Sequence, residues 1–225
     1  MNRAQVRPGD GHRRGDRFRD RREAGRQLAD ALRGFAPRHP VVLGLPRGGV
    51  PVADEVAAAL DAPLDVLVVR KLGLPRQPEV AMGAVGEGDA VVWNDDVVRS
   101  SGVGASERRR IEVRERAEVE ARVGRFRGGR PAVDLAGRTA IVVDDGVATG
   151  ATARVACRIA RELGASEVVL AVPVGPPEVI AGLREADEVV CLEQPDSFMA
   201  VGMHYVDFGQ TPDDEVVAVL RERAT

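Results

Sequence analysis

Several features that mark common classes of protein are scarce or missing in this chain of 225 residues. No apolar run approaches the roughly 20 residues of a membrane-spanning helix, so no membrane span is predicted. The formal net charge of −3 gives no general attraction to nucleic acids or acidic membranes. Cys157 and Cys191 are isolated, which favours buried core residues of a cytoplasmic protein over a disulfide framework. The three histidines are scattered and lack the spacing of metal ligands.

Aromatic residues and lysine are also rare. Aromatics make up 3% of the chain, so valine, alanine and leucine must fill the core. Lys71 is the only lysine among 32 basic residues. Because lysine carries a compact charge on a flexible stem, Lys71 is a candidate for a position that needs those properties.

The first 15 residues are polar and show no hydrophobic period. They are predicted to form a disordered, Arg-rich lead-in, and they lack the apolar segment of a secretory signal. The arginines up to Arg22 could contact RNA, but the interleaved Asp16, Asp20 and Glu23 argue against a nucleic-acid surface.

From residue 16 to 225 the pattern is that of one α/β domain. A helical pattern begins at Phe18 and ends near Gly34, and short Val-rich runs then alternate with helical segments. The predicted strands are 41–45, 64–69, 139–143, 167–172 and 188–192, and the predicted helices between them are 49–60, 150–163 and 176–185. This alternation predicts a parallel sheet with helices on both faces.

The middle of the chain breaks this rhythm. Residues 79–94 contain two short extended runs around a Gly-Glu-Gly-Asp turn, which predicts a hairpin. Residues 106–126 form a highly charged helical pattern, and its charges are interpreted as a solvated face. An excursion as long as 71–130 inside a wound domain is typical of a segment that covers an active site, so we expect a lid here.

The most informative stretch is "IVVDDGVATGAT", residues 141–152. Asp144 and Asp145 end a buried strand, at the sheet edge where ligands of parallel sheets bind. The small residues that follow leave backbone amides exposed at the start of a helix, which is a favourable place for an anion. Carboxylates beside such an anion site suit the hydroxyls of a ribose. A Walker A loop is excluded because Gly150 is followed by Ala151 and not by lysine.

This stretch closely resembles the phosphoribosyl-pyrophosphate (PRPP) loop of type I phosphoribosyltransferases, and the resemblance extends over roughly residues 16–222. It implies that Asp144 and Asp145 hold the ribose hydroxyls of PRPP. It also implies a 5-phosphate site formed by Gly146, Val147, Ala148, Thr149, Gly150, Ala151 and Thr152.

Two further segments supply the cations that such a reaction needs. "GLPRGG" at 44–49 resembles the pyrophosphate-binding loop of the family, with Arg47, Gly48 and Gly49, although Arg47 stands where others carry a small residue. Arg70 and Lys71 are predicted at the end of the next strand, at the same sheet edge. We expect Arg47, Arg70 and Lys71 to act as catalytic groups that stabilise departing pyrophosphate, with Mg2+ carried mainly on the substrate's oxygens.

The C-terminal segment 193–210 resembles the hood that contacts the base in 6-oxopurine phosphoribosyltransferases. The resemblance implies that Phe198 stacks on a purine and that Asp207 lies near the metal, although the spacing after Phe198 is one residue longer than in that pattern. Ala148 stands where those enzymes carry an acid, and the "DDxxATG" form instead resembles adenine phosphoribosyltransferases. The acceptor base therefore stays open.

The sequence thus predicts a cytoplasmic, Mg2+-dependent phosphoribosyltransferase. It would transfer the phosphoribosyl group of PRPP to a nitrogenous base, with a purine favoured, and release pyrophosphate. A homodimer is expected because such sites often borrow residues from a neighbouring subunit. The alternatives are a PRPP-binding regulator without turnover, motivated by Ala148, and hydrolysis with water as the nucleophile.

Overall fold

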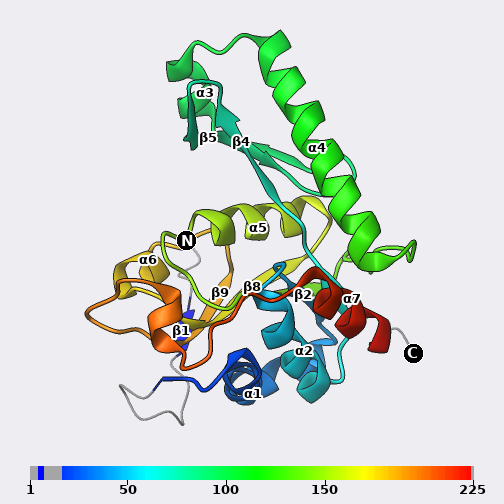
Figure 1. Ribbon diagram of the computed structural model, residues 1–225, viewed down its shortest axis with the longest axis vertical. Helices are drawn as coiled ribbons and strands as arrows, with labels where there is room; N and C mark the ends of the chain where they lie inside the picture. The colour runs from blue at the N-terminus through cyan, green and yellow to red at the C-terminus, as the bar shows by residue number, and fades with distance from the viewer. Residues whose placement is uncertain (1–4, 8–16, 224–225) are drawn as a thin grey trace.

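The computed structural model of the protein describes residues 5–7 and 17–223, and its centre is a six-stranded parallel sheet (Figure 1). The strand order is β1-β9-β8-β7-β2-β3, and every neighbouring pair is parallel. The strands are β1 (Gln5–Arg7), β2 (Val41–Gly44), β3 (Leu64–Val66), β7 (Thr139–Val143), β8 (Glu167–Val174) and β9 (Glu188–Glu193). β1 comes from the segment predicted to be disordered, and the other residues of that segment lie outside the described part.

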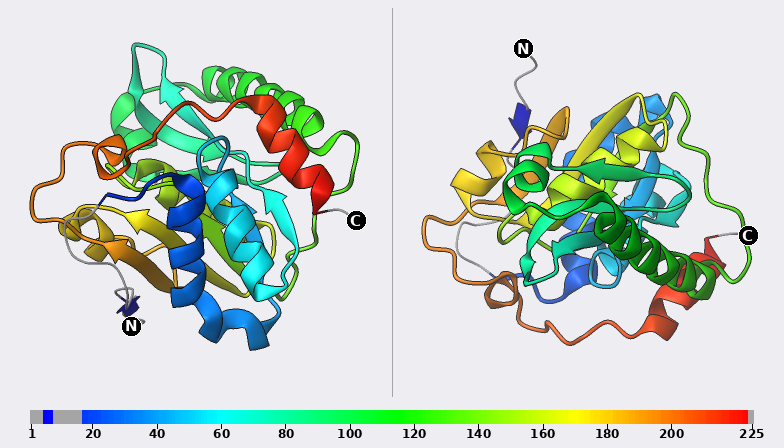
Figure 2. Two further views of the ribbon diagram at one scale, coloured as in Figure 1. Left: turned by 60° about the horizontal axis from the view of Figure 1, so that its bottom comes forward. Right: turned by 90° about the horizontal axis from the view of Figure 1, so that it is seen from above.

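Helices cover both faces of this sheet, which confirms the predicted α/β class. The helices of the core are α1 (Arg21–Leu32), α2 (Gly49–Leu60), α5 (Ala151–Glu162), α6 (Pro177–Ala181) and α7 (Asp213–Glu222), with 3-10 turns at Arg33–Arg38 and Val201–His204. α1 and α2 lie side by side against one face (Figure 2), and α5 packs on the other. Alternate strand residues serve the two layers: Val42 packs on the α1–α2 side, whereas Val41 and Leu43 pack on the α5 side.

Helix boundaries differ from the prediction where a cap or a short turn intervenes. The first helix begins at Arg21, because the side chain of Asp20 accepts a hydrogen bond from the amide of Glu23 at 2.7 Å and caps it. The helix predicted at 176–185 is a short one, Pro177–Ala181. Within the described residues, no helix combines the length and the apolar character that a membrane crossing requires.

Residues 70–127 form a lobe beyond α5 (Figure 1). It contains the antiparallel sheet β4-β5-β6, made of β4 (Arg70–Leu74), β5 (Gln77–Val85) and β6 (Val91–Trp93), followed by α3 (Asp95–Ser101) and α4 (Ala105–Arg127). The predicted hairpin 79–94 is present as β5 and β6. The predicted strand 64–69 was too long, because β3 ends at Val66. Arg70 and Lys71 therefore open a strand of the lobe and do not end a strand of the central sheet.

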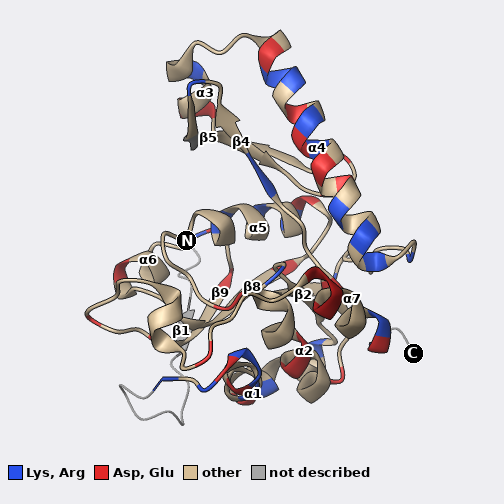
Figure 3. Cartoon of the chain, viewed as in Figure 1, with Lys and Arg blue, Asp and Glu red and all other residues tan. Residues whose placement is uncertain are grey.

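The charged helix α4 is less solvated than its composition predicts. Acidic and basic side chains alternate along it (Figure 3), yet Glu112 and Glu115 are buried. Glu112 pairs with Arg116 at 2.9 Å, and Glu115 pairs with Arg70 of β4 at 2.8 Å. Buried carboxylates persist where such partners compensate for lost hydration, so ion pairs help to attach α4 to the lobe sheet.

A buried arginine fixes the base of the lobe to the core. The side chain of Arg127, only 8% exposed, donates from Nε to Asp65 Oδ1 at 2.8 Å and from Nη2 to Glu87 Oε1 at 2.9 Å. Asp65 Oδ2 also accepts from the amide of Val133 at 2.9 Å. Burial raises the pKa of Glu87, and the hydrogen bond from Arg127 opposes this shift. The network joins β3, the β5–β6 turn and the end of α4.

Replacing Arg127 with alanine is expected to lower the free energy of unfolding by about 3–5 kcal/mol, because Asp65 and Glu87 would remain buried without their cation. Urea denaturation measures this change. The matched control is Arg110→Ala on the same helix: Arg110 is 78% exposed and lies 3.9 Å from Glu107, so its loss should change stability by about 0.5 kcal/mol or less. Equal effects of the two substitutions would contradict the assigned role of Arg127.

Candidate active site

Two aspartates follow the buried strand β7 at the carboxyl edge of the central sheet. Asp145 Oδ2 accepts a hydrogen bond from Arg21 Nε of α1 at 2.8 Å, and the Asp145 side chain is 16% exposed. Asp144 Oδ1 accepts from the amide of Asp145 at 2.9 Å. The two carboxyls thus belong to adjacent residues at the end of β7, and Arg21 pairs with Asp145 alone.

The environment disfavours negative charge on both carboxyls. Burial raises the pKa of Asp144 well above its usual value, and the neighbouring charge of Asp145 raises it further. Burial also raises the pKa of Asp145, while the hydrogen bond from Arg21 opposes that shift. A ligand that donates hydrogen bonds to this pair, or that brings a cation, would favour the ionised forms and bind more tightly for that reason.

The turn after the aspartates leaves amides available at the start of α5. The amide of Val147 donates to the carbonyl of Val174 at 2.8 Å, whereas the amides of residues 148–150 donate to no other part of the described chain. Gly150 has a φ of +76° and precedes α5, a conformation that favours glycine. Unengaged amides at the N-terminus of a 12-residue helix are suited to a phosphate.

The "GLPRGG" loop, between β2 and α2, packs directly on these aspartates. A Cβ at Gly48 would lie 2.0 Å from Asp145 Oδ2, and one at Gly49 would lie 2.6 Å from the carbonyl oxygen of Val143. The peptide between Pro46 and Arg47 is cis. The "GLPRGG" loop and the turn after β7, which the sequence predicts to bind one substrate, therefore meet. Glycine is required at Gly48 and Gly49 because the backbones approach too closely for a side chain.

Arg47 is oriented toward the C-terminal helix. Its Nη1 lies 3.4 Å from Asp213 Oδ1 of α7, and Asp213 also pairs with Arg125 of α4 at 2.6 Å. Arg47 thus lies in the loop that the sequence predicts to bind pyrophosphate, but its guanidinium is paired with Asp213 within the protein. Its predicted catalytic and pyrophosphate-binding roles stay predictions.

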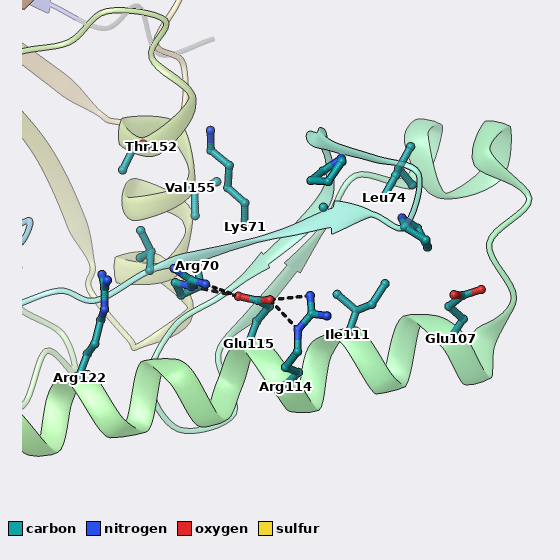
Figure 4. Close-up of a pocket in the computed structure, with 14 residues that line it drawn as sticks. Arg70, Lys71, Leu74, Glu107, Ile111, Arg114, Glu115, Arg122, Thr152 and Val155 are labelled. Carbon is teal, nitrogen blue, oxygen red and sulfur yellow. Dashed lines mark hydrogen bonds and ion pairs between the residues drawn. The ribbon is translucent and has the colours of Figure 1, made fainter.

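Arg70 and Lys71 line a cavity of about 640 Å³ between the lobe and α5, which Figure 4 shows. Lys71 is exposed and extends on the α5 side, where Thr152 also lines the cavity. Arg70 instead turns to Glu115, which also accepts from Arg114 (Figure 4). The structure therefore places Lys71 near the end of the predicted phosphate loop, whereas Arg70 is engaged within the lobe.

The hood segment packs against the loop from the other side. A Cβ at Gly146 would lie 2.5 Å from Val201 Cγ1, so the two segments touch. Phe198 stacks on His204, with ring centroids 5.3 Å apart and planes inclined by 10°. Burial and the charge of Arg17 lower the pKa of His204, which favours its neutral form. The predicted base-binding residue thus belongs to a pair of stacked rings.

Asp207, the predicted metal residue, is exposed and accepts from the amide of Gly209 at 3.1 Å. In the described ranges, no group of three or more His, Cys, Asp or Glu side chains is arranged to hold a metal ion. Asp207 therefore belongs to no such group among the described residues.

Comparison with known proteins identifies the family. The model of the phosphoribosyl transferase domain matches residues 21–206. The chain belongs to this family. A relative from Mycobacterium tuberculosis H37Rv, whose name assigns it provisionally to the phosphoribosyl transferases, is 57% identical over 204 residues; the match covers 90% of this chain and 46% of the relative. This chain thus spans about half the length of the curated relatives it matches.

A solved structure also resembles this phosphoribosyl transferase domain over nearly its full length. The protein TT1426 from Thermus thermophilus is 48% identical with a TM-score of 0.84, and the match covers 92% of this chain and 98% of that one. The family predicted from residues 141–152 is therefore confirmed.

Two residues of the candidate site are not predicted by the sequence. Arg21 lies in an arginine run that suggests at most an RNA contact, and nothing local connects it to Asp145. The hydroxyl of Tyr205 donates to the backbone carbonyl of Asp145 at 2.7 Å. Tyr205 is the only tyrosine of the chain, and this rarity in the hood was a usable signal.

Asp144→Asn is expected to stabilise the protein at pH 7, because the amide carries no charge for burial to penalise. Because the pKa of Asp144 is raised on folding, the folded state binds this proton more tightly, and stability falls as pH rises through the raised pKa. The asparagine removes that loss. Thermal unfolding from pH 4 to pH 8 measures this change in stability, and Asp89→Asn, at an exposed position, is the control. An Asp144→Asn variant that is less stable than the unmodified chain at pH 7 would refute this prediction.

Proposed function

We propose that the chain is a Mg2+-dependent phosphoribosyltransferase that uses PRPP and a nitrogenous base and releases pyrophosphate. The observation that carries this proposal is the pairing of two strand-end carboxylates with unengaged amides in the next turn. A ribose with a 5-phosphate needs both features a few ångströms apart. Family membership and the contact of the "GLPRGG" loop with the same aspartates support the proposal.

In this mechanism Asp144 and Asp145 accept hydrogen bonds from the ribose hydroxyls, and the amides of residues 148–150 hold the 5-phosphate. The bond from the anomeric carbon to pyrophosphate breaks, a bond to the nitrogen of the base forms, and the proton of that nitrogen passes to water. Positive charge develops on the sugar and negative charge on the leaving group. Lys71, after movement of the lobe, and Arg47, after release from Asp213, would stabilise the latter.

Mg2+ is proposed to enter with PRPP. The described residues offer no complete cage for this ion, so oxygens of the substrate would supply most of its ligands. Asp207 is the protein residue that the family resemblance assigns to it. When bound, the ion would neutralise charge on the pyrophosphate oxygens.

A purine is the favoured acceptor because the stacked Phe198 and His204 rings form a flat aromatic platform in the hood. Ala148 favours the second candidate, a PRPP-binding regulator without turnover: it is exposed at the position where 6-oxopurine enzymes carry an acid. In that case the site would bind PRPP and leave it intact.

Pyrophosphate release with PRPP, Mg2+ and a panel of purines and pyrimidines tests the proposal. We expect release that depends on one base or a small group of bases. PRPP binding, measured by calorimetry, without release for any base would favour the regulator. Release with no base added would indicate hydrolysis.

The same assay includes Gly48→Ala, whose Cβ would displace the Asp145 carboxylate, and we expect PRPP binding to be lost in this variant. Gly104→Ala is the control, because no atom lies within 4 Å of a Cβ there.

We also propose a cytoplasmic homodimer. Cys157 and Cys191 are free and buried, as expected for a reducing compartment. The hood exposes three large apolar side chains, Met199, Met203 and Val206, which a partner subunit would cover. Size-exclusion chromatography with light scattering should give the mass of a dimer. Met199→Lys should shift the mass toward that of the monomer. The control Val113→Lys, at an exposed apolar position on α4, should leave the mass unchanged.

A further inference from the structure

Arg21 joins three parts of the molecule at the candidate site. From the first residue of α1, its Nε donates to Asp145 Oδ2 at 2.8 Å and its Nη1 donates to the carbonyl oxygen of Gly209 at 2.6 Å. Its guanidinium lies over the ring of Phe208, 4.0 Å from the centroid. The side chain is 13% exposed. Such a desolvated, multiply bonded arginine holds its partners in a fixed geometry.

The hood is fastened to Asp145 by two routes. Tyr205 donates to the backbone carbonyl of Asp145, and Arg21 connects the Asp145 side chain to Gly209 and Phe208. Tyr205 also packs against Phe208, with centroids 4.9 Å apart. The orientation of this carboxylate and the position of segment 205–209 are therefore set together.

Only one oxygen of the Asp145 carboxylate is used by Arg21. Oδ2 accepts from Nε, and no hydrogen bond within the described residues is donated to Oδ1. A carboxylate anchored through one oxygen can present the other to a hydroxyl. Anchoring through a cation also favours the charged form, which is the stronger acceptor.

We propose that Arg21 is a positioning residue of the PRPP site: it holds the Asp145 carboxylate ionised and aimed at the ribose, and it couples this grip to the hood. The inference rests on the proposed function. Arg21 does not touch the reacting atoms, and it acts through Asp145.

The groups that face Asp145 define what a substitution changes. Arg21 comes from α1, Asp144 precedes it on the strand end, and the hydroxyl of Tyr205 comes from the hood. The "GLPRGG" loop contributes backbone at Gly48. Arg21 is the cation of this set, so its loss leaves two adjacent carboxyls without compensation.

The test compares Arg21→Gln, Arg21→Lys and the control Arg22→Gln. Glutamine keeps a polar side chain but removes the charge, and lysine restores the charge. Arg22 is the next residue of the same helix and pairs with Asp54 of α2, away from the aspartates. Two quantities are measured: the titration midpoint of the Asp145 carboxyl by 13C NMR without ligand, and the PRPP–Mg2+ dissociation constant from pH 5.5 to 8.5.

In Arg21→Gln we expect the Asp145 midpoint to move to higher pH and PRPP binding at pH 7 to weaken about tenfold, the usual size of a lost charge-assisted hydrogen bond. The pH at which acidification weakens PRPP binding should also move to a higher value. Arg21→Lys should recover most of both changes. Arg22→Gln should leave both at the values of the unmodified chain.

The proposal would be overturned if Arg21→Gln left unchanged both the Asp145 titration midpoint and the pH at which acidification weakens PRPP binding. Equal changes in Arg21→Gln and Arg21→Lys would also overturn it, because a role in packing alone does not depend on the charge of the side chain. Failure of the unmodified chain to bind PRPP would contradict the proposed function and the ribose part of this inference. The ligand-free titration would still decide whether Arg21 controls the ionisation of Asp145.

Discussion

The site depends on keeping two adjacent carboxylates at the buried end of a strand. Burial and mutual repulsion oppose the charge of Asp144 and Asp145, so the surrounding structure must compensate. It does so with one guanidinium and one backbone amide, whereas the close packing of the loop at Gly48 and Gly49 adds to the burial. The two carboxylates do not serve stability, because two neutral side chains at these positions would cost less free energy to bury. Their presence is explained if a bound ligand supplies the remaining compensation for their charge.

The parts that the sequence could predict are those with a local cause. The Val-rich runs, the paired aspartates and the small-residue turn are readable because each depends on neighbours a few positions away. Arg21 and Asp145 are 124 positions apart, and only the parallel winding brings α1 beside the end of β7. The run 64–69 looks like one strand because all of its residues except Asp65 are apolar, yet β3 ends at Val66 and the chain leaves the sheet. The apolar character of this run indicates that its residues are buried, but it does not indicate that they pair with a neighbouring strand.

The lobe shows a different limit of prediction from pattern. A helix with alternating charges predicts a solvated face, but α4 buries Glu112 and Glu115 against arginines from two elements. Its attachment to the core passes through Arg127 and two acids that the sequence separates by tens of residues. Apolar side chains of the lobe, among them Leu72, Met82 and Phe126, also pack in one cluster with residues of the core, so the lobe is attached by apolar contacts as well as by ion pairs.

The two sides of the site differ in how completely the structure explains them. On the side proposed to bind the sugar phosphate, the acids, the amides and the glycine loop converge, and Arg21 and Tyr205 connect them to the hood. On the acceptor side, Phe198 already stacks on His204, and Ala148 offers no proton acceptor. Burial lowers the pKa of His204, which favours its neutral form. If the proposed transfer takes place, a base that displaces or extends this ring stack would couple its own binding to the hood segment that Arg21 and Tyr205 connect to Asp145.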